Sequence, residues 1–96
     1  MNKQDYITVR AAVNEDSGQH LLGSIVREIK GGTADAGTIR RAQYVEAHYP
    51  EVWKRNHWLR YLGGYNPDLP AEQMRVDVLA EIEDDLREFE ATIDLR

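Results

Sequence analysis

Apolar residues return along this chain at the spacing of an α-helix, and no other feature of the sequence constrains its fold as strongly. Between Ser17 and Lys30 they form one stripe, which contains Leu21, Leu22, Ile25, Val26 and Ile29. A second series follows alternating steps of three and four in a helix predicted from Ala71 to Ile93, and it contains Leu79, Ile82, Leu86, Phe89 and Ile93. Such stripes are typical of amphipathic helices. The sequence therefore predicts a mainly α-helical bundle of about four helices.

Two further helices are expected between these segments. The first runs from Thr33 or Thr38 to about Tyr49, after the glycine pair 31–32, which can end the preceding helix. The second begins at Pro50, whose missing amide hydrogen costs nothing in a first turn, and ends at the glycine pair 63–64. Residues 65–70, which contain two prolines, form a predicted loop.

The segment YITVRAAV, residues 6–13, fits two structures. Its apolar residues alternate as in a strand, which would have to pair with a second copy because the chain has no other strand candidate of useful length. The element order would then resemble that of ribbon-helix-helix regulators, with Thr8 and Arg10 facing the DNA groove. Alternatively, Asn2 and Asp5 form a capping arrangement at the start of a short helix. The helix is favoured, and a strand paired across a homodimer is the alternative.

The series 79–93 also allows a homodimer, through a seam of two such helices. The repeat is short for a coiled coil. Packing within its own bundle is therefore favoured over a seam between two copies.

Composition places the chain among ordinary folded proteins. Its 96 residues suffice for one small helical domain, 1–96, and 42% of them are hydrophobic. The sequence contains no cysteine, which excludes disulfides, thiolate-based zinc sites and thiol nucleophiles. No apolar run approaches the ~20 residues needed to span a bilayer, and a cytoplasmic protein without a membrane partner is the expectation.

The net charge of −5 is distributed unevenly. Residues 39–60 contain five Lys/Arg and two Asp/Glu, whereas residues 61–96 contain three and ten. An acidic total argues against nonspecific coating of nucleic acid, because that affinity comes mainly from neutralised phosphates. A local basic face and a strongly acidic C-terminal helix are the two charged features that a partner could use.

The stretch GGTADAGTIRR, residues 31–41, has two functional interpretations. Its glycine spacing partly matches a phosphate-binding loop, but the required lysine is missing and a predicted helix precedes it, so nucleotide binding is not expected. Two helices joined by a short glycine-containing turn also match the outline of a helix-turn-helix at residues 18–48. The second helix would then present the side chains that could contact nucleic acid, Thr38, Arg40, Arg41 and Gln43.

Aromatic and basic residues are interleaved between positions 53 and 65, a pattern that suits a protein partner or stacked bases. Trp53 shares a face with core positions, so it is assigned to the core and Trp58 is taken as the better surface candidate. The predicted partner-binding residues are Lys54, Arg55, Trp58, Arg60 and Tyr61.

No catalytic, cofactor or metal site is predicted. His20, His48 and His57 do not have the i, i+4 spacing of a helical zinc pair. The acidic residues between 83 and 90 are those expected on the solvated face of an amphipathic helix. The chain is therefore not expected to be an enzyme.

These features predict a small acidic protein that binds another protein. A narrower version makes it an inhibitor or accessory factor of a nucleic-acid-handling machine, of the phage or mobile-element type, whose acidic helix imitates phosphates and enters a basic cleft. The alternative is a DNA-binding transcriptional regulator that uses residues 38–43.

Overall fold

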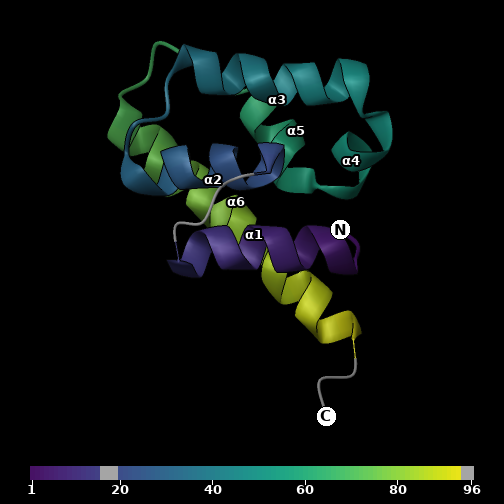
Figure 1. Cartoon of the computed structure of the whole chain (residues 1–96). Coiled ribbons are helices and arrows are strands. Elements are labelled where there is room, and N and C mark those ends of the chain that lie inside the picture. Colours follow the sequence, from purple (N-terminus) through teal and green to yellow (C-terminus); the bar gives the residue numbers. More distant parts are fainter. Residues whose placement is uncertain (16–19, 94–96) are drawn as a thin grey trace.

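Six α-helices and no strand make up the described part of the chain, which a computed structural model gives as residues 1–15 and 20–93. In order, the helices are α1 (Lys3–Glu15), α2 (Leu21–Gly31), α3 (Ala36–His48), α4 (Pro50–Arg55), α5 (His57–Gly63) and α6 (Ala71–Thr92). α3 lies along one edge of the molecule, and the C-terminal end of α6 projects past α1 at the opposite edge (Figure 1). The prediction of a mainly α-helical protein is confirmed. Within these ranges, no helix combines the length and the apolar character needed to cross a membrane.

The ambiguous segment 6–13 lies within helix α1. The Asn2 side chain accepts from the backbone N–H of Asp5 at 2.9 Å, and the Asp5 carboxylate lies 3.5 Å from the backbone nitrogen of Asn2. This reciprocal pair satisfies amides that have no partner in a first turn. Val9 and Ala12 are fully buried on the inner face of the helix. The favoured helix is therefore confirmed, and the paired strand, with its ribbon-helix-helix order, is wrong.

The glycine-rich joint connects α2 to α3. Gly32 has a left-handed φ of 76°, which glycine adopts without strain, and the backbone N–H of Thr33 reaches the carbonyl of Glu28 at 3.0 Å. α3 then begins at Ala36, because Asp35 and Thr38 exchange side-chain and backbone hydrogen bonds in a capping box. Its start thus falls between the two predicted ones. α2 begins at Leu21, after His20 with extended backbone angles, φ −86° and ψ 158°, and the predicted start at Ser17 lies outside the described residues.

The helix predicted from Pro50 to the second glycine pair is broken at Asn56 into α4 and α5. Asn56 has extended backbone angles, φ −119° and ψ 96°, and its side chain is buried. Its amide nitrogen donates to the carbonyl of Val52 at 2.9 Å and to the carboxylate of Asp5 at 3.1 Å. The backbone N–H of Trp58, exposed by the break, donates to Asp85 of α6 at 2.8 Å. This break and the confirmed α1 account for six helices in place of about four.

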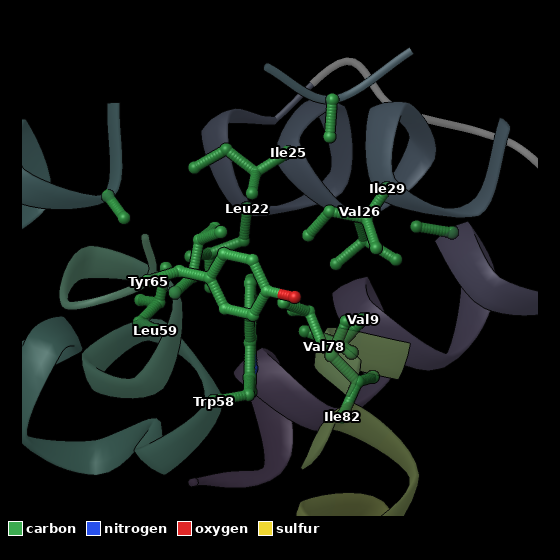
Figure 2. Close-up of a cluster of buried hydrophobic side chains, with 14 of the residues drawn as sticks. Val9, Leu22, Ile25, Val26, Ile29, Trp58, Leu59, Tyr65, Val78 and Ile82 are labelled. Atoms are coloured by element: carbon green, nitrogen blue, oxygen red, sulfur yellow. The ribbon is translucent and has the colours of Figure 1, made fainter. Parts of the chain in front are cut away.

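Buried residues of α1, α2, α3, α5 and α6 form one core, and Figure 2 labels several of those of α1, α2, α5 and α6 together with Tyr65. Trp58 and Leu59 of α5 are fully buried against residues of α2 and α6. The buried residues of α6 recur at steps of four and are Met74, Val78, Ile82 and Leu86. Ile82 and Leu86 of the predicted series are therefore covered within one chain, whereas Leu79, Phe89 and Ile93 are only partly buried.

Candidate functional site

The predicted partner-binding residue Arg55 is part of a buried polar junction between α1 and α4. Its guanidinium donates from Nε and Nη2 to the two carboxylate oxygens of Asp5, at 2.8 and 3.3 Å. Asp5 is only 5% exposed, and Asn56 donates to the same carboxylate. Burial raises the pKa of Asp5, but the hydrogen bonds from Arg55 and Asn56 outweigh burial and hold the pKa below its ordinary value. Arg55 thus supports the fold, although part of its side chain reaches solvent.

Arg60 and Gln43 hold the C-terminal ends of the two short helices. Arg60 Nη1 donates to the carbonyl of Lys54 at 2.6 Å, at the end of α4. Gln43 Nε2 donates to the carbonyl of Gly63 at 2.9 Å, at the end of α5. Carbonyls in the last turn of a helix have no partner within it, and cationic side chains also interact favourably with that end of the dipole. Both exposed side chains therefore have structural partners.

Two of the residues predicted to contact nucleic acid, Thr38 and Arg41, bind Glu28 of α2 instead. Thr38 is fully buried, and its hydroxyl donates to Glu28 at 2.9 Å. Arg41 forms an ion pair with the same carboxylate. Only Arg40 and Gln43 of the four predicted residues are exposed, and Gln43 is bound to Gly63. The structure does not bring these four side chains together on one accessible face.

The two tryptophans have the opposite exposure from the one expected. Trp58 is fully buried, so its assignment as the surface ring was wrong. The break at Asn56 rotates α5 relative to α4, which turns Trp58 inwards beside Leu59 and Leu62. Trp53 is half-buried, and its ring covers Gly63. Among the remaining predicted contacts, Lys54 is exposed and Tyr61 is 37% exposed.

Sequence reasoning missed a cluster of exposed rings at the end of α3, which we call the aromatic cluster: Tyr44, His48 and Tyr49. Tyr44 is 47% and Tyr49 is 50% exposed. The rings of Tyr44 and His48 stack at a centroid distance of 3.9 Å, and Tyr49 lies 6.3 Å from Tyr44. A usable signal was present, because Tyr44 and His48 are four residues apart on the side of α3 opposite to its buried residues.

A cavity of about 240 Å³ lies beside this cluster, between α1, α2, α3 and α4. Its walls are Asp5, Thr8, His20, Leu21, Leu22, Val45, Tyr49 and Val52. Tyr49 lines the cavity and is half exposed, so the cavity reaches the surface at the aromatic cluster. At Tyr49, an exposed aromatic ring thus borders a hollow with mainly apolar walls.

A second hollow, of about 260 Å³, lies between the α4–α5 junction and the end of α6. It is more polar, and it is lined by Met1, Arg55, His57, Arg60, Asp85, Glu88, Phe89 and Thr92. His57 Nδ1 lies 3.3 Å from Glu81, and burial raises the pKa of Asp85 even though the backbone N–H of Trp58 donates to it. No three His, Cys, Asp or Glu residues in the described ranges are grouped so that they could hold a metal ion.

The acidic residues of α6 are largely engaged within the chain. Glu83 and Glu90 form ion pairs with Arg10 of α1, and Asp77 accepts from the hydroxyl of Tyr65 at 2.7 Å. Further contacts join Glu72 to Arg75, Glu81 to His57, Asp84 to Arg87 and Asp85 to Trp58. The arginines among these partners are Arg10, Arg75 and Arg87, so ion pairs balance part of the negative charge predicted for this helix.

Comparison with protein-family models, with curated proteins and with solved structures finds no significant match for this chain. The chain's own surface is therefore the basis for a functional proposal.

Proposed function

We propose that this chain is a small, non-catalytic, cytoplasmic protein that binds another protein through the aromatic cluster of α3 and the cavity beside it. The observation that carries the proposal is the exposure of Tyr44, which stacks on His48, and of Tyr49, which lines the adjacent hollow with its mainly apolar walls. Tyrosine is enriched among the residues that contribute most to protein–protein binding, because its ring offers a large contact area and its hydroxyl a hydrogen bond.

The surroundings of the cluster support this use. Its rings are attached to the end of a helix whose other side is anchored by buried Ile39, Ala42 and Val45. A rigid helical support reduces the side-chain entropy that binding must remove. Ring stacking between Tyr44 and His48 restricts both side chains further before a partner arrives.

The other functions considered from the sequence draw less support. Of the predicted DNA contacts, Thr38 is buried and Arg41 is neutralised by Glu28, which leaves few cations to engage phosphates. Phosphate imitation by α6, as an inhibitor of a nucleic-acid-handling machine, is weakened by the internal ion pairs of that helix. A homodimer loses the paired strand that motivated it, and Ile82 and Leu86 of the proposed seam are buried within one chain.

Capture of a partner from a lysate of the organism that encodes the chain tests the proposal. The double variant Tyr44→Ala/Tyr49→Ala should lose the partner. The matched control is Leu69→Ala/Val76→Ala, which removes two apolar side chains of similar exposure, 42% and 53%, elsewhere on the surface. Equal retention of the partner by both variants would refute the proposed surface. A gel shift at low salt that is abolished by Arg40→Glu would instead favour nucleic acid as the partner.

A further inference from the structure

We propose that the cavity beside the aromatic cluster receives one aromatic side chain of the partner that carries a neutral N–H or O–H donor, a tryptophan or a tyrosine. This inference rests on the proposed function and specifies the chemistry of the partner. Three features of the cavity lead to it: its size, its apolar walls and the carboxylate of Asp5.

The size of the cavity suits a single side chain. Its volume of about 240 Å³ is below the roughly 300–1,000 Å³ of pockets that hold drug-sized ligands. It exceeds the roughly 150 Å³ that is enough to bind benzene in an engineered protein cavity. A six-membered or fused aromatic ring therefore fits, whereas a larger cofactor would not be enclosed.

The walls favour an apolar ring. The apolar part of the walls consists of Leu21 and Leu22 of α2, Val45 of α3 and Val52 of α4. Half-exposed Tyr49 stands at the mouth, where it can contact the edge of an inserted ring. Offset or edge-to-face contacts between aromatic rings add about 0.5–1.5 kcal/mol beyond the area they bury.

The carboxylate of Asp5 selects a donor. Its Oδ2 accepts from Arg55 at 2.8 Å and from Asn56 at 3.1 Å. Its Oδ1 accepts from one described group, Arg55 Nη2, at the longer distance of 3.3 Å. Each carboxylate oxygen can accept two hydrogen bonds, so Oδ1 of this cavity-lining residue retains acceptor capacity.

The charge of the junction selects a neutral donor. Arg55 already balances the charge of Asp5, so an ammonium or guanidinium group in the cavity would meet no uncompensated carboxylate there. A carboxylate would be repelled by Asp5 itself. An indole N–H or a phenol O–H satisfies the remaining acceptor without adding charge.

Small-molecule probes test this inference on the intact chain. We would titrate the ¹⁵N-labelled protein with indole and with indene, which has the same shape but no N–H donor, and follow the amide shifts of Thr8, Leu22 and Val45. Indole should bind in the millimolar range and about tenfold more tightly than indene, which corresponds to one net hydrogen bond. Benzylamine and benzoate should both bind more weakly than indole.

Variants that fill the cavity provide the second arm. Val52→Phe should abolish the indole shifts, whereas Val76→Phe, the same change at a 53% exposed site on α6, should leave them unchanged. Leu21→Phe serves as a second filling variant in case Val52→Phe does not fold.

Three results would overturn the inference: indene binding as tightly as indole, indole shifts that survive both filling variants, or no saturable shift at millimolar indole. None of them involves the partner, so a partner lost by the Tyr44/Tyr49 variant would still support the proposed function.

Discussion

Replacing Asp5 by Asn should destabilise the protein more than any other single charge removal in the described residues. Asp5 is 5% exposed and accepts from Arg55 and Asn56, and the asparagine amide would turn a donor towards one of them. Breaking a buried ion pair costs about 3–5 kcal/mol because one charge is left uncompensated. Arg55 is 33% exposed and can be partly rehydrated, which lowers the expected loss to about 2–3 kcal/mol.

Urea denaturation at pH 7 measures this loss as a lower midpoint with an unchanged slope. The matched control is Asp84→Asn, in the exposed pair with Arg87, where the same chemical change should cost only about 0–0.5 kcal/mol. For a domain of this size, the Asp5 variant should also melt roughly 10–20 °C lower.

The pH dependence gives an independent check. The pKa of Asp5 is lowered in the folded state, so its stabilisation is complete above the ordinary value near 3.8 and is lost as the pH falls through the folded pKa. The difference between wild type and Asp5→Asn should therefore shrink in strongly acidic solution. Equal losses for the Asp5 and Asp84 variants at pH 7, or a difference that persists at low pH, would refute the reasoning.

Four other predictions concern the packing of the short helices. Gly63→Ala should cost about 1–3 kcal/mol, because the added Cβ would lie 2.5 Å from the ring of Trp53. Gly31→Ala should stabilise α2 by up to about 1 kcal/mol, because the added Cβ would meet no neighbouring atom within 4 Å. Thermal unfolding of the two variants compares these effects. Trp58→Ala should cost about 3–5 kcal/mol in urea denaturation. Acrylamide should quench the fluorescence of a Trp58→Phe variant, which retains half-buried Trp53, several-fold more strongly than that of Trp53→Phe; the reverse order would contradict the burial of Trp58. Asp85→Ala should cost about 1 kcal/mol because it removes the acceptor of the Trp58 N–H at the start of α5. Burial raises the pKa of Asp85 above its ordinary value of 3.8, so protonation of Asp85 in the wild type should add stability as the pH falls from the folded pKa towards 3.8, which a pH series of unfolding midpoints for wild type and variant would detect.

The helical repeat was enough to predict the fold class because it is local. Stripes in α2 and α6, Pro50 at the start of α4 and the Asn2–Asp5 cap are all encoded within a few neighbouring residues. The break at Asn56 could not be predicted in the same way. It depends on Asp5, 51 residues away, and the free amide that it creates is satisfied by Asp85, 27 residues beyond Trp58.

The same long-range contacts explain why the predicted site residues were a poor guide to the surface. Counting charges treated each arginine between positions 39 and 60 as available to a partner. In the folded chain, Arg55 balances a buried carboxylate, Arg60 binds the last carbonyls of α4 and Arg41 pairs with Glu28. The short helices create this need for side-chain donors. Their closely spaced ends leave many backbone groups without a partner inside a helix, and side chains must satisfy them.

The surface side chains that are not needed to satisfy helix ends or buried charges are the candidates for binding a partner. A side chain that binds a helix end cannot also bind a partner without weakening the fold. Binding should therefore use side chains that make few hydrogen bonds or ion pairs within the chain. Tyr44 and Tyr49 meet that condition, since each is about half exposed and their ring contacts lie within the cluster itself. Asp5 connects the two roles: the same carboxylate that fixes the α1–α4 junction lines the cavity beside these rings. A partner that engages Asp5 should therefore stabilise the whole bundle, because it binds only the state in which that junction is formed.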